Sequence, residues 1–350
     1  HIGGCGLIAE NGKWIQSPIL EGEQMGDEML YDWEFGSFSN DYLIIRKSGK
    51  YGIINRAGDM LVKPKYEQLE QLENPNYFRV LVDGMYGVID ATGRIIVPAE
   101  YNYIGRMSED MIVAKRGRDY GCFDANGTNV VPFEFLEIKE YVGGMARIQG
   151  RNGRYGFIDK NGSDLVLTMF DSVEYYSEDL ALVTAMGAVG FVDMQGNWVV
   201  RPIYDNGRSF SCGLAPVCSK NKWGYIDKSG DEKIALKFDS AEEFNKEYKI
   251  ARVSKGGKWG VINDKGTDIV PISFDEVIIC ADVYIYVKRD DKCGVYSSKG
   301  DIVCPVECDD RGLYNSKSIM FKHGIAKVML NGHSVKLDSF GNIISLYTDK

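Results

Sequence analysis

The sequence is poor in the residues that most enzymes use for proton transfer. Its 350 residues contain three histidines, His1, His323 and His333. No spacing typical of a serine hydrolase, a zinc protease, a P-loop or a dinucleotide-binding loop is present. The sequence therefore predicts a protein that is not an enzyme and that carries no cofactor and no metal ion.

Long apolar runs and an excess of positive charge are lacking as well. A membrane helix needs roughly 18–20 consecutive apolar residues, and no run in this chain approaches that length. The formal net charge is −9, with 41 Lys and Arg against 50 Asp and Glu. Because a nucleic-acid surface needs a dominant basic face, we expect no nucleic-acid partner. Because a long apolar run is missing, we expect no insertion into a membrane.

One phrase recurs along the chain: an aromatic residue, Gly, two apolar residues, Asp, two further residues and a second Gly. Regular copies begin at Tyr51, Tyr86, Tyr120, Tyr155, Val189, Trp223, Trp259 and Cys293, and degenerate copies at Cys5 and Ser334. From Gly52 onward, successive copies are 34–36 residues apart. A fixed period of this length indicates a repeat array. We expect one continuous array over residues 1–350, with regular units at about 41–310 and degenerate end units at about 1–40 and 311–350.

Each unit reads as three short strands. An apolar run such as Tyr42–Arg46 comes first, the Gly phrase is the second strand, and the segment behind the second Gly is the third. The third strand usually ends at a Pro, which cannot donate to a ladder. An aromatic residue follows, and the phrase Phe-Asp-x-Val is a candidate for a short fourth strand.

The fold class that follows is all-β, a tandem array of about ten three- to four-stranded units. An open superhelical or solenoid-like array is favoured over a closed propeller-like ring. Propellers typically use four to eight blades of about 40 residues or more, and the two ends of this chain do not complement each other as halves of one blade.

The recurring aspartates predict turns. A short carboxylate at the first position of a four-residue turn accepts a hydrogen bond from the N–H two residues on, and Gly at the fourth position takes a positive φ. Asn55 and Asn263 replace Asp, as an Asx turn allows. The alternative, a row of metal-binding or catalytic aspartates, is disfavoured by that replacement. The turn residues are Asp90, Asp124, Asp159, Asp193 and Asp227.

The repeat aromatics predict packing. A Gly inside a strand marks the close approach of another group, and we expect the adjacent ring to be buried between units. The alternative is a ladder of sugar-binding platforms, which Val189 and Cys293 disfavour because they occupy the same slot without a ring. The rings are Tyr51, Tyr86, Tyr120, Tyr155, Trp223 and Trp259.

Eight cysteines are too few for a disulfide scaffold in a chain of this length. Five of them, Cys5, Cys122, Cys293, Cys304 and Cys308, fall on apolar positions of the repeat. We expect buried, free thiols, which favours a cytoplasmic location. A zinc site is the alternative for the last four cysteines, although they form no paired CxxC spacing. These are Cys280, Cys293, Cys304 and Cys308. The chain begins at His1, so the alternative that an N-terminal targeting segment has been removed stays open.

The segments Trp223–Asp227 and Lys258–Ile262 resemble the hallmark of the WG-repeat family, also called KWG repeats. The resemblance extends from about Cys5 to Gly341, although four copies carry Tyr in place of Trp. It implies a mainly bacterial origin and a role in interaction or scaffolding. It brings no catalytic residues.

The resulting functional prediction is a non-catalytic scaffold that binds a protein partner. Variable loops on a rigid framework are where recognition usually sits, so the spacers between the invariant phrases are the candidate contacts. The alternative is a module that binds carbohydrate or a cell-envelope polymer, so a polysaccharide partner stays open. Candidate partner-binding residues are Glu67, Tyr77, Tyr175, Tyr176, Glu242 and Tyr248.

Overall fold

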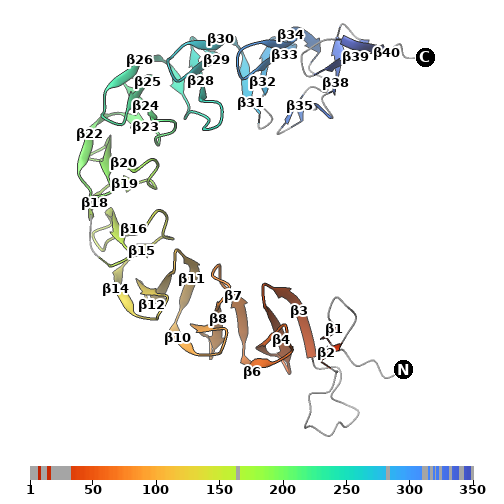
Figure 1. The fold of residues 1–350 in the computed structure, drawn as a ribbon. Helices are drawn as coiled ribbons and strands as arrows, with labels where there is room; N and C mark the ends of the chain where they lie inside the picture. The colour runs from red at the N-terminus through yellow and green to blue at the C-terminus, as the bar shows by residue number, and fades with distance from the viewer. Residues whose placement is uncertain are drawn as a thin grey trace. The chain divides into compact units, whose positions relative to one another are not determined.

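The computed structural model describes residues 33–162, 166–280 and 284–309, together with the segments 7–8, 14–16, 314–315, 318–319, 321–322, 325–330, 333–338 and 343–347. Every regular element in these residues is a β-strand, so the all-β prediction is confirmed. No helix that could cross a membrane occurs in this part of the chain. Figure 1 shows the strands in successive small groups along the chain.

The chain divides into two compact units, His1–Met169 and Phe170–Lys350. In the first unit, consecutive strands pair antiparallel in groups of four. Sheet 1 contains β3 (Trp33–Ser39), β4 (Tyr42–Lys47), β5 (Lys50–Asn55) and β6 (Met60–Tyr66). Sheet 2 contains β7 (Gln68–Gln71), β8 (Tyr77–Val82), β9 (Met85–Asp90) and β10 (Ile95–Tyr101). Sheet 3 contains β11 (Tyr103–Ser108), β12 (Met111–Arg116), β13 (Asp119–Asp124) and β14 (Asn129–Phe135). Sheet 4 contains β15 (Glu137–Ile138), β16 (Met145–Gln149), β17 (Tyr155–Asp159) and β18 (Val166–Phe170), whose last residue begins the second unit.

The second unit repeats the same order. Sheet 5 contains β19 (Ser172–Val173), β20 (Leu180–Ala185), β21 (Ala188–Asp193) and β22 (Trp198–Tyr204). Sheet 6 contains β23 (Asn206–Gly207), β24 (Leu214–Ser219), β25 (Lys222–Asp227) and β26 (Glu232–Phe238). Sheet 7 contains β27 (Ser240–Ala241), β28 (Ile250–Lys255), β29 (Lys258–Asn263) and β30 (Asp268–Phe274). Sheet 8 begins with β31 (Glu276–Ile279), β32 (Tyr284–Arg289), β33 (Lys292–Ser297) and β34 (Ile302–Asp309).

The two degenerate copies lie at the ends of this series. β1 (Leu7–Ile8) and β2 (Trp14–Gln16) form a hairpin, while most of the predicted first copy lies outside the described residues. The last copy extends sheet 8, because β38 pairs with β34. Its strands are β37 (Phe321–Lys322), β38 (Ile325–Leu330), β39 (His333–Asp338) and β40 (Ile343–Tyr347), beside a separate pair, β35 (Tyr314–Asn315) and β36 (Ser318–Ile319).

The short fourth strand exists, but it opens the next sheet instead of closing its own. In the segment Phe238-Asp239-Ser240-Ala241, for example, Ser240 pairs with Ser254 and Ala241 with Val253 of β28. Each sheet therefore ends at the aromatic residue in front of this segment. The predicted units of three to four strands are confirmed, with the boundary one strand earlier in the chain.

The hydrophobic core lies between neighbouring sheets. One buried cluster joins Tyr225 and Ile234 of sheet 6 to Ala251 and Ile262 of sheet 7. Corresponding clusters join sheets 1 and 2, 2 and 3, 3 and 4, 5 and 6, and 7 and 8. Because burial of one large aliphatic side chain contributes about 1.5–3 kcal/mol, each sheet depends on the sheets beside it.

The first glycine of each phrase faces a bulge in the fourth strand of its own sheet. In sheet 1, Tyr51 pairs with Tyr66 and Ile53 with Val62, so β6 has two extra residues around Pro64. A Cβ on Gly52 would lie 2.4 Å from the Val62 carbonyl oxygen. The expectation that Pro ends the strand is wrong, because the bulge leaves Pro64 inside β6, where its missing N–H removes no ladder bond.

The close approach at this glycine gives a stability prediction. A Cβ on Gly224 would lie 2.4 Å from the Ile234 oxygen and 2.7 Å from the backbone nitrogen of Leu236. Gly224→Ala should lower the free energy of unfolding by about 1–3 kcal/mol, the usual cost of overpacking. Urea denaturation measures this. Gly105→Ala is the matched control, because its nearest contact is the end of the Tyr103 side chain at 3.3 Å. Equal effects of the two substitutions would contradict the role of the bulge.

Candidate functional site

The antiparallel order of each sheet creates two rims. Hairpins between its second and third strands, together with the link to the next sheet, lie at one end of the strands, which we call the hairpin rim. Loops between its first and second strands, together with the Asp-x-x-Gly turns, lie at the other end, which we call the loop rim.

The repeat aspartates make the turns that the sequence predicts. The Asp227 carboxylate accepts hydrogen bonds from the N–H groups of Ser229 at 2.9 Å and Asp231 at 3.0 Å. Gly230 has a φ of 88° and donates its N–H to the Asp227 carbonyl at 2.9 Å. The hydrogen bond to the N–H two residues on recurs at Asp90, Asp124, Asp159, Asp193 and Asn263.

These turns also pack on the preceding sheet. A Cβ on Gly127 would lie 2.0 Å from the Ile96 oxygen, and one on Gly230 would lie 3.0 Å from Val200. The turn carboxylates are therefore used by the framework. No group of three His, Cys, Asp or Glu side chains with metal-site geometry occurs among the described residues.

The repeat aromatics are half-buried, so the prediction that they are buried between units is wrong. Buried rings instead end the fourth strands, where Tyr66, Phe238 and Phe274 are at most 4% exposed. Trp223 pairs across the sheet with Phe238, and Trp259 with Phe274. The ring at the end of the strand takes the place in the core, which leaves its partner nearer the surface. The half-buried set is Tyr51, Tyr86, Tyr120, Tyr155, Trp223 and Trp259.

Cations cover five of these rings. The distances from guanidinium carbon or ammonium nitrogen to ring centroid are 5.5 Å for Arg46 and Tyr51, 5.5 Å for Arg79 and Tyr86, 5.0 Å for Lys115 and Tyr120, 5.7 Å for Arg208 and Trp223, and 4.8 Å for Arg252 and Trp259. Such contacts contribute about 0.5–1 kcal/mol at exposed sites. A sugar would have to displace the cation to stack on any of these faces.

The lysine in front of the ring ties neighbouring sheets together at the hairpin rim. Lys222 pairs with Asp239 at 2.6 Å, and Asp239 also accepts the N–H of Gly256 in the next hairpin at 2.6 Å. Lys258 and Asp275 repeat the pair, with the N–H of Asp290 donated to Asp275 at 2.8 Å. In sheet 1 the same pair is Lys50 and Glu67 at 3.4 Å.

A hydrogen-bond ladder ties neighbouring sheets together at the loop rim. Ser177 donates to the Phe210 carbonyl at 2.8 Å, and Ser211 donates to the Phe244 carbonyl at 2.7 Å. The Glu109 carboxylate accepts the N–H groups of Gly143 at 2.7 Å and Gly144 at 2.8 Å. Each rung reaches from a loop of one sheet to the loop of the next.

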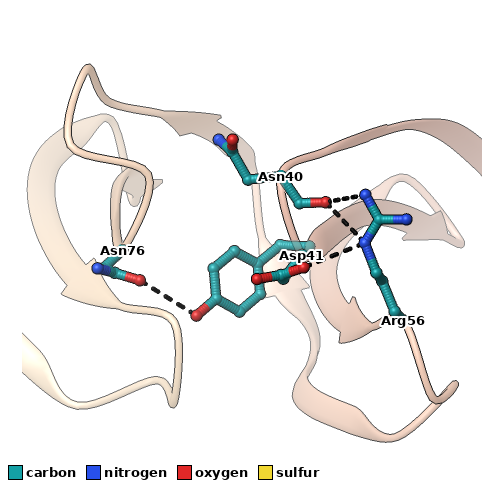
Figure 2. A network of polar contacts seen from close by, with 5 residues as sticks. Asn40, Asp41, Arg56 and Asn76 are labelled. Atoms are coloured by element: carbon teal, nitrogen blue, oxygen red, sulfur yellow. Dashed lines mark hydrogen bonds and ion pairs between the residues drawn. The ribbon is translucent and has the colours of Figure 1, made fainter.

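Figure 2 shows the corresponding contacts in sheets 1 and 2. Arg56, from a turn, donates to the Asn40 carbonyl at 2.6 and 3.0 Å and to the Asp41 carboxylate at 3.1 Å, which fixes turn and loop together. Tyr42 donates to the Asn76 side-chain oxygen at 3.2 Å, which makes the rung to sheet 2.

A groove opens beside this ladder in the first unit. Its volume is about 470 Å³. The lining residues come from β7, β8 and the loop between them in sheet 2, from β11 of sheet 3 and from the loop of sheet 4: Glu70, Gln71, Leu72, Glu73, Arg79, Tyr103, Arg106 and Glu140. Tyr103 is 45% exposed, and Glu73, Arg106 and Glu140 are exposed. Arg79 pairs with Glu70 and donates to the Ile104 carbonyl at 2.7 Å, so its charge is already compensated.

A family model described as WG containing repeat matches six segments, 51–86, 86–117, 120–154, 155–184, 190–223 and 223–259, which together span more than half of the chain. The chain belongs to the WG-repeat family. No curated protein matches it.

Similar solved structures include a eukaryotic initiation factor, with 10% identity, a TM-score of 0.38, and coverage of 88% of this chain and 96% of the other. Sqt1 of Saccharomyces cerevisiae has 11% identity, a TM-score of 0.29 and coverage of 74% and 88%. Hsv2 of Kluyvelomyces marxianus has 14% identity, a TM-score of 0.26 and coverage of 76% and 91%. Likeness at this level carries no argument about what the WG-repeat chain does.

Several of the candidate partner-binding residues are used within the WG-repeat framework. The Glu67 carboxylate pairs with Lys50 at 3.4 Å and accepts a hydrogen bond from the N–H of Gly84 at 3.3 Å. Tyr176 donates to the Asp193 carbonyl at 3.1 Å, and Glu242 pairs with Arg252. The other three, Tyr77, Tyr175 and Tyr248, are half-buried. The sequence missed Tyr103 and Arg106, because no residue pattern marks a groove between separate sheets.

The cysteines of the WG-repeat chain fill apolar positions. Cys122, Cys218, Cys280, Cys293 and Cys304 are buried. Burial raises the pKa of the Cys122 thiol to about 12, which keeps it protonated and unreactive near neutral pH. Cys5 and the side chain of Cys308 lie outside the described part of the chain.

The carboxylates that join WG repeats at the hairpin rim predict a pH dependence. Hydrogen bonds from Lys222 and Gly256 lower the pKa of Asp239, and those from Lys258 and Asp290 lower the pKa of Asp275. A lowered pKa stabilises the fold above the unfolded-state value of about 3.9, and this stabilisation is lost as the pH falls through the folded-state value.

The urea concentration at the midpoint of unfolding should therefore decrease as the pH is lowered from about 5 to about 3. The decrease should be smaller in D239N/D275N, because this variant lacks the stabilising contribution of the two carboxylates already at neutral pH. Glu243→Gln with Glu247→Gln is the matched control, because both carboxylates are exposed and form no ion pair among the described residues. If the urea midpoints of D239N/D275N and wild type depended on pH in the same way, Asp239 and Asp275 would not stabilise the contact between sheets.

Proposed function

We propose that this WG-repeat chain is a non-catalytic scaffold that binds a protein partner in the groove of its first unit. The observation that carries the proposal is a groove of about 470 Å³ along the first strands of sheets 2 and 3, lined by exposed charges from three successive sheets. Its lining includes Glu70 and Glu73, which lie between the predicted contacts Glu67 and Tyr77, and Glu140 from the loop of sheet 4.

Residues that recur in several repeats have intramolecular partners. Asp227 holds its own turn, Gly224 accommodates the bulge, and Lys222 pairs with Asp239. Recognition must then come from residues that differ between repeats. Within the described residues, Glu73 and Arg106 differ from their counterparts in other sheets, and neither they nor Glu140 form an ion pair.

The chemistry of the groove suits a peptide segment that carries both signs of charge. Arg106 offers a planar donor for a carboxylate, while Glu73 and Glu140 offer acceptors for a lysine or arginine. Tyr103 adds an exposed ring, and tyrosine supplies a large contact area at a low cost in conformational entropy. A volume of several hundred Å³ fits the usual size of a binding cleft.

A module that binds carbohydrate or a cell-envelope polymer is the second candidate. Half-buried rings in successive repeats favour it. Cations over five of those rings weigh against it, since they occupy the faces on which a sugar would stack. We therefore rank protein binding first.

Photocrosslinking tests the groove. A photoreactive amino acid at position 103 should crosslink a partner polypeptide in cell extract, and the same amino acid at position 134 should not, because the exposed Glu134 lies on β14, the opposite edge strand of sheet 3. Arg106→Glu should abolish the crosslink at 103, while its free energy of unfolding stays within about 0.5 kcal/mol of wild type.

The matched control is Arg201→Glu, which makes the same charge change on an exposed residue of β22, outside the groove lining, and should retain the crosslink. Equal crosslinking from positions 103 and 134 would refute the groove. A glycan array that retains binding to wild type and loses it with Tyr103→Ala would favour the polymer-binding alternative.

A further inference from the structure

The chain contains six Asn-Gly dipeptides, and four of them lie among the described residues. The other two, at positions 11 and 331, lie outside that part of the chain. In such a dipeptide the glycine nitrogen can attack the side-chain carbonyl carbon of the asparagine, because glycine has no Cβ to hinder the approach. All four described asparagines are exposed, so exposure does not decide which one reacts: Asn126, Asn152, Asn161 and Asn206.

In three of the four dipeptides, a turn holds the glycine N–H away from the asparagine. Each N–H donates to the carbonyl three residues earlier, from Gly127 to Asp124 at 3.0 Å, from Gly153 to Gly150 at 2.9 Å and from Gly162 to Asp159 at 3.2 Å. Two of these turns also pack closely, since a Cβ on Gly127 would lie 2.0 Å from the Ile96 oxygen and one on Gly162 would lie 2.1 Å from the Val130 oxygen. The nitrogen reaches its own asparagine only after the turn opens.

Gly207 is held in the opposite way. Its N–H donates to the Oδ1 of Asn206 at 2.8 Å, which places the nitrogen beside the carbonyl carbon that it would attack. The N–H groups that face the partner strand alternate along an antiparallel strand. That of Arg208 faces β24, where it donates to the Pro216 carbonyl at 2.9 Å. The N–H of Gly207 therefore points away from β24 and toward Asn206.

Hydrogen bonds on both sides fix this dipeptide in place. Asp205 donates its N–H to the Cys218 carbonyl at 2.9 Å, and its carboxylate accepts the N–H of Lys220 at 2.7 Å. Arg208 supplies the bond on the other side. Because the two reacting groups are already oriented, the reaction needs less ordering than it would in a mobile segment.

We propose that Asn206 is a site of spontaneous deamidation, ahead of the other three asparagines. The Gly207 nitrogen loses its proton to hydroxide and bonds to the side-chain carbonyl carbon of Asn206, while the amide nitrogen takes up a proton from water and leaves as ammonia. Water then opens the cyclic imide. Cleavage between the Gly207 nitrogen and the side-chain carbon gives aspartate, and cleavage between that nitrogen and the main-chain carbonyl carbon gives isoaspartate.

Isoaspartate at this position disturbs the contact between sheets 5 and 6. It lengthens the main chain by a carbon atom in front of Gly207, which pairs with Val217. The same glycine lies against sheet 5, because a Cβ on it would lie 3.0 Å from Val189 and 3.2 Å from Leu182. The longer main chain displaces Gly207 from this register and from this contact.

Incubation of the purified chain at mildly alkaline pH, followed by peptide mapping with tandem mass spectrometry, measures the rate at each asparagine. In the folded chain, Asn206 should react at least about tenfold faster than each of the other three, a difference of about 1.4 kcal/mol in activation free energy. In concentrated urea the four rates should converge, because the turns are lost. Rates that keep the same ratios in urea, or a folded-chain rate at Asn206 no higher than the others, would overturn the proposal.

The urea midpoint of the aged chain tests the consequence for the two sheets. Aged wild type should unfold at a lower urea concentration than fresh wild type, in proportion to its isoaspartate content. Aged Asn206→Gln is the control for other damage, because glutamine would have to close a larger ring. Fresh Asn206→Asp is the control for the added charge, because it leaves the main chain unchanged. Both controls should keep the midpoint of fresh wild type, and an equal decrease in either one would refute the effect of isoaspartate on sheets 5 and 6.

Discussion

Face-to-face packing of one small sheet on the next is the interaction on which the rest of the structure depends. The central strands carry apolar residues on both faces, as in β24, where five of six residues are buried. A sheet of four short strands cannot cover both faces by itself. Val217 and Ile226 of sheet 6 therefore pack with Phe191 of sheet 5, and Tyr225 packs with Val253 of sheet 7. Every recurrent polar contact then serves to fix the spacing and orientation of neighbouring sheets.

Polar contacts at the two rims do this in different ways. At the hairpin rim, the carboxylate behind the buried aromatic joins the lysine of its own sheet to a backbone N–H of the next, as Asp239 does. At the loop rim, serine and glutamate side chains bond the backbone of the next loop, as Ser211 and Glu109 do. Since these side chains are already used within the chain, the proposed binding uses positions outside these contacts, such as Tyr103 and Arg106.

Much of the framework could be predicted from the sequence because its physical causes are local. An Asx turn needs only Asp or Asn with Gly three residues later, as Asp227 and Gly230 show. The burial of the repeat aromatics was predicted wrongly, because two rings of one sheet compete for the same side of the core. Phe238 and Phe274 occupy the core, and that outcome depends on the bulge that sets Trp223 opposite Phe238 and Trp259 opposite Phe274.

The sequence by itself determined the repeat, the all-β class, the turns and the position of the close-approach glycines, since each follows from residue type at a fixed spacing. Only the tertiary structure decided what the spacers do. Whether Glu67 and Glu242 are free for a partner or paired within the chain depends on Lys50 and Arg252, which lie on neighbouring strands. The groove around Arg106 arises in the same way. It requires residues about 34 positions apart to meet, and that meeting is set by the stacking of sheets.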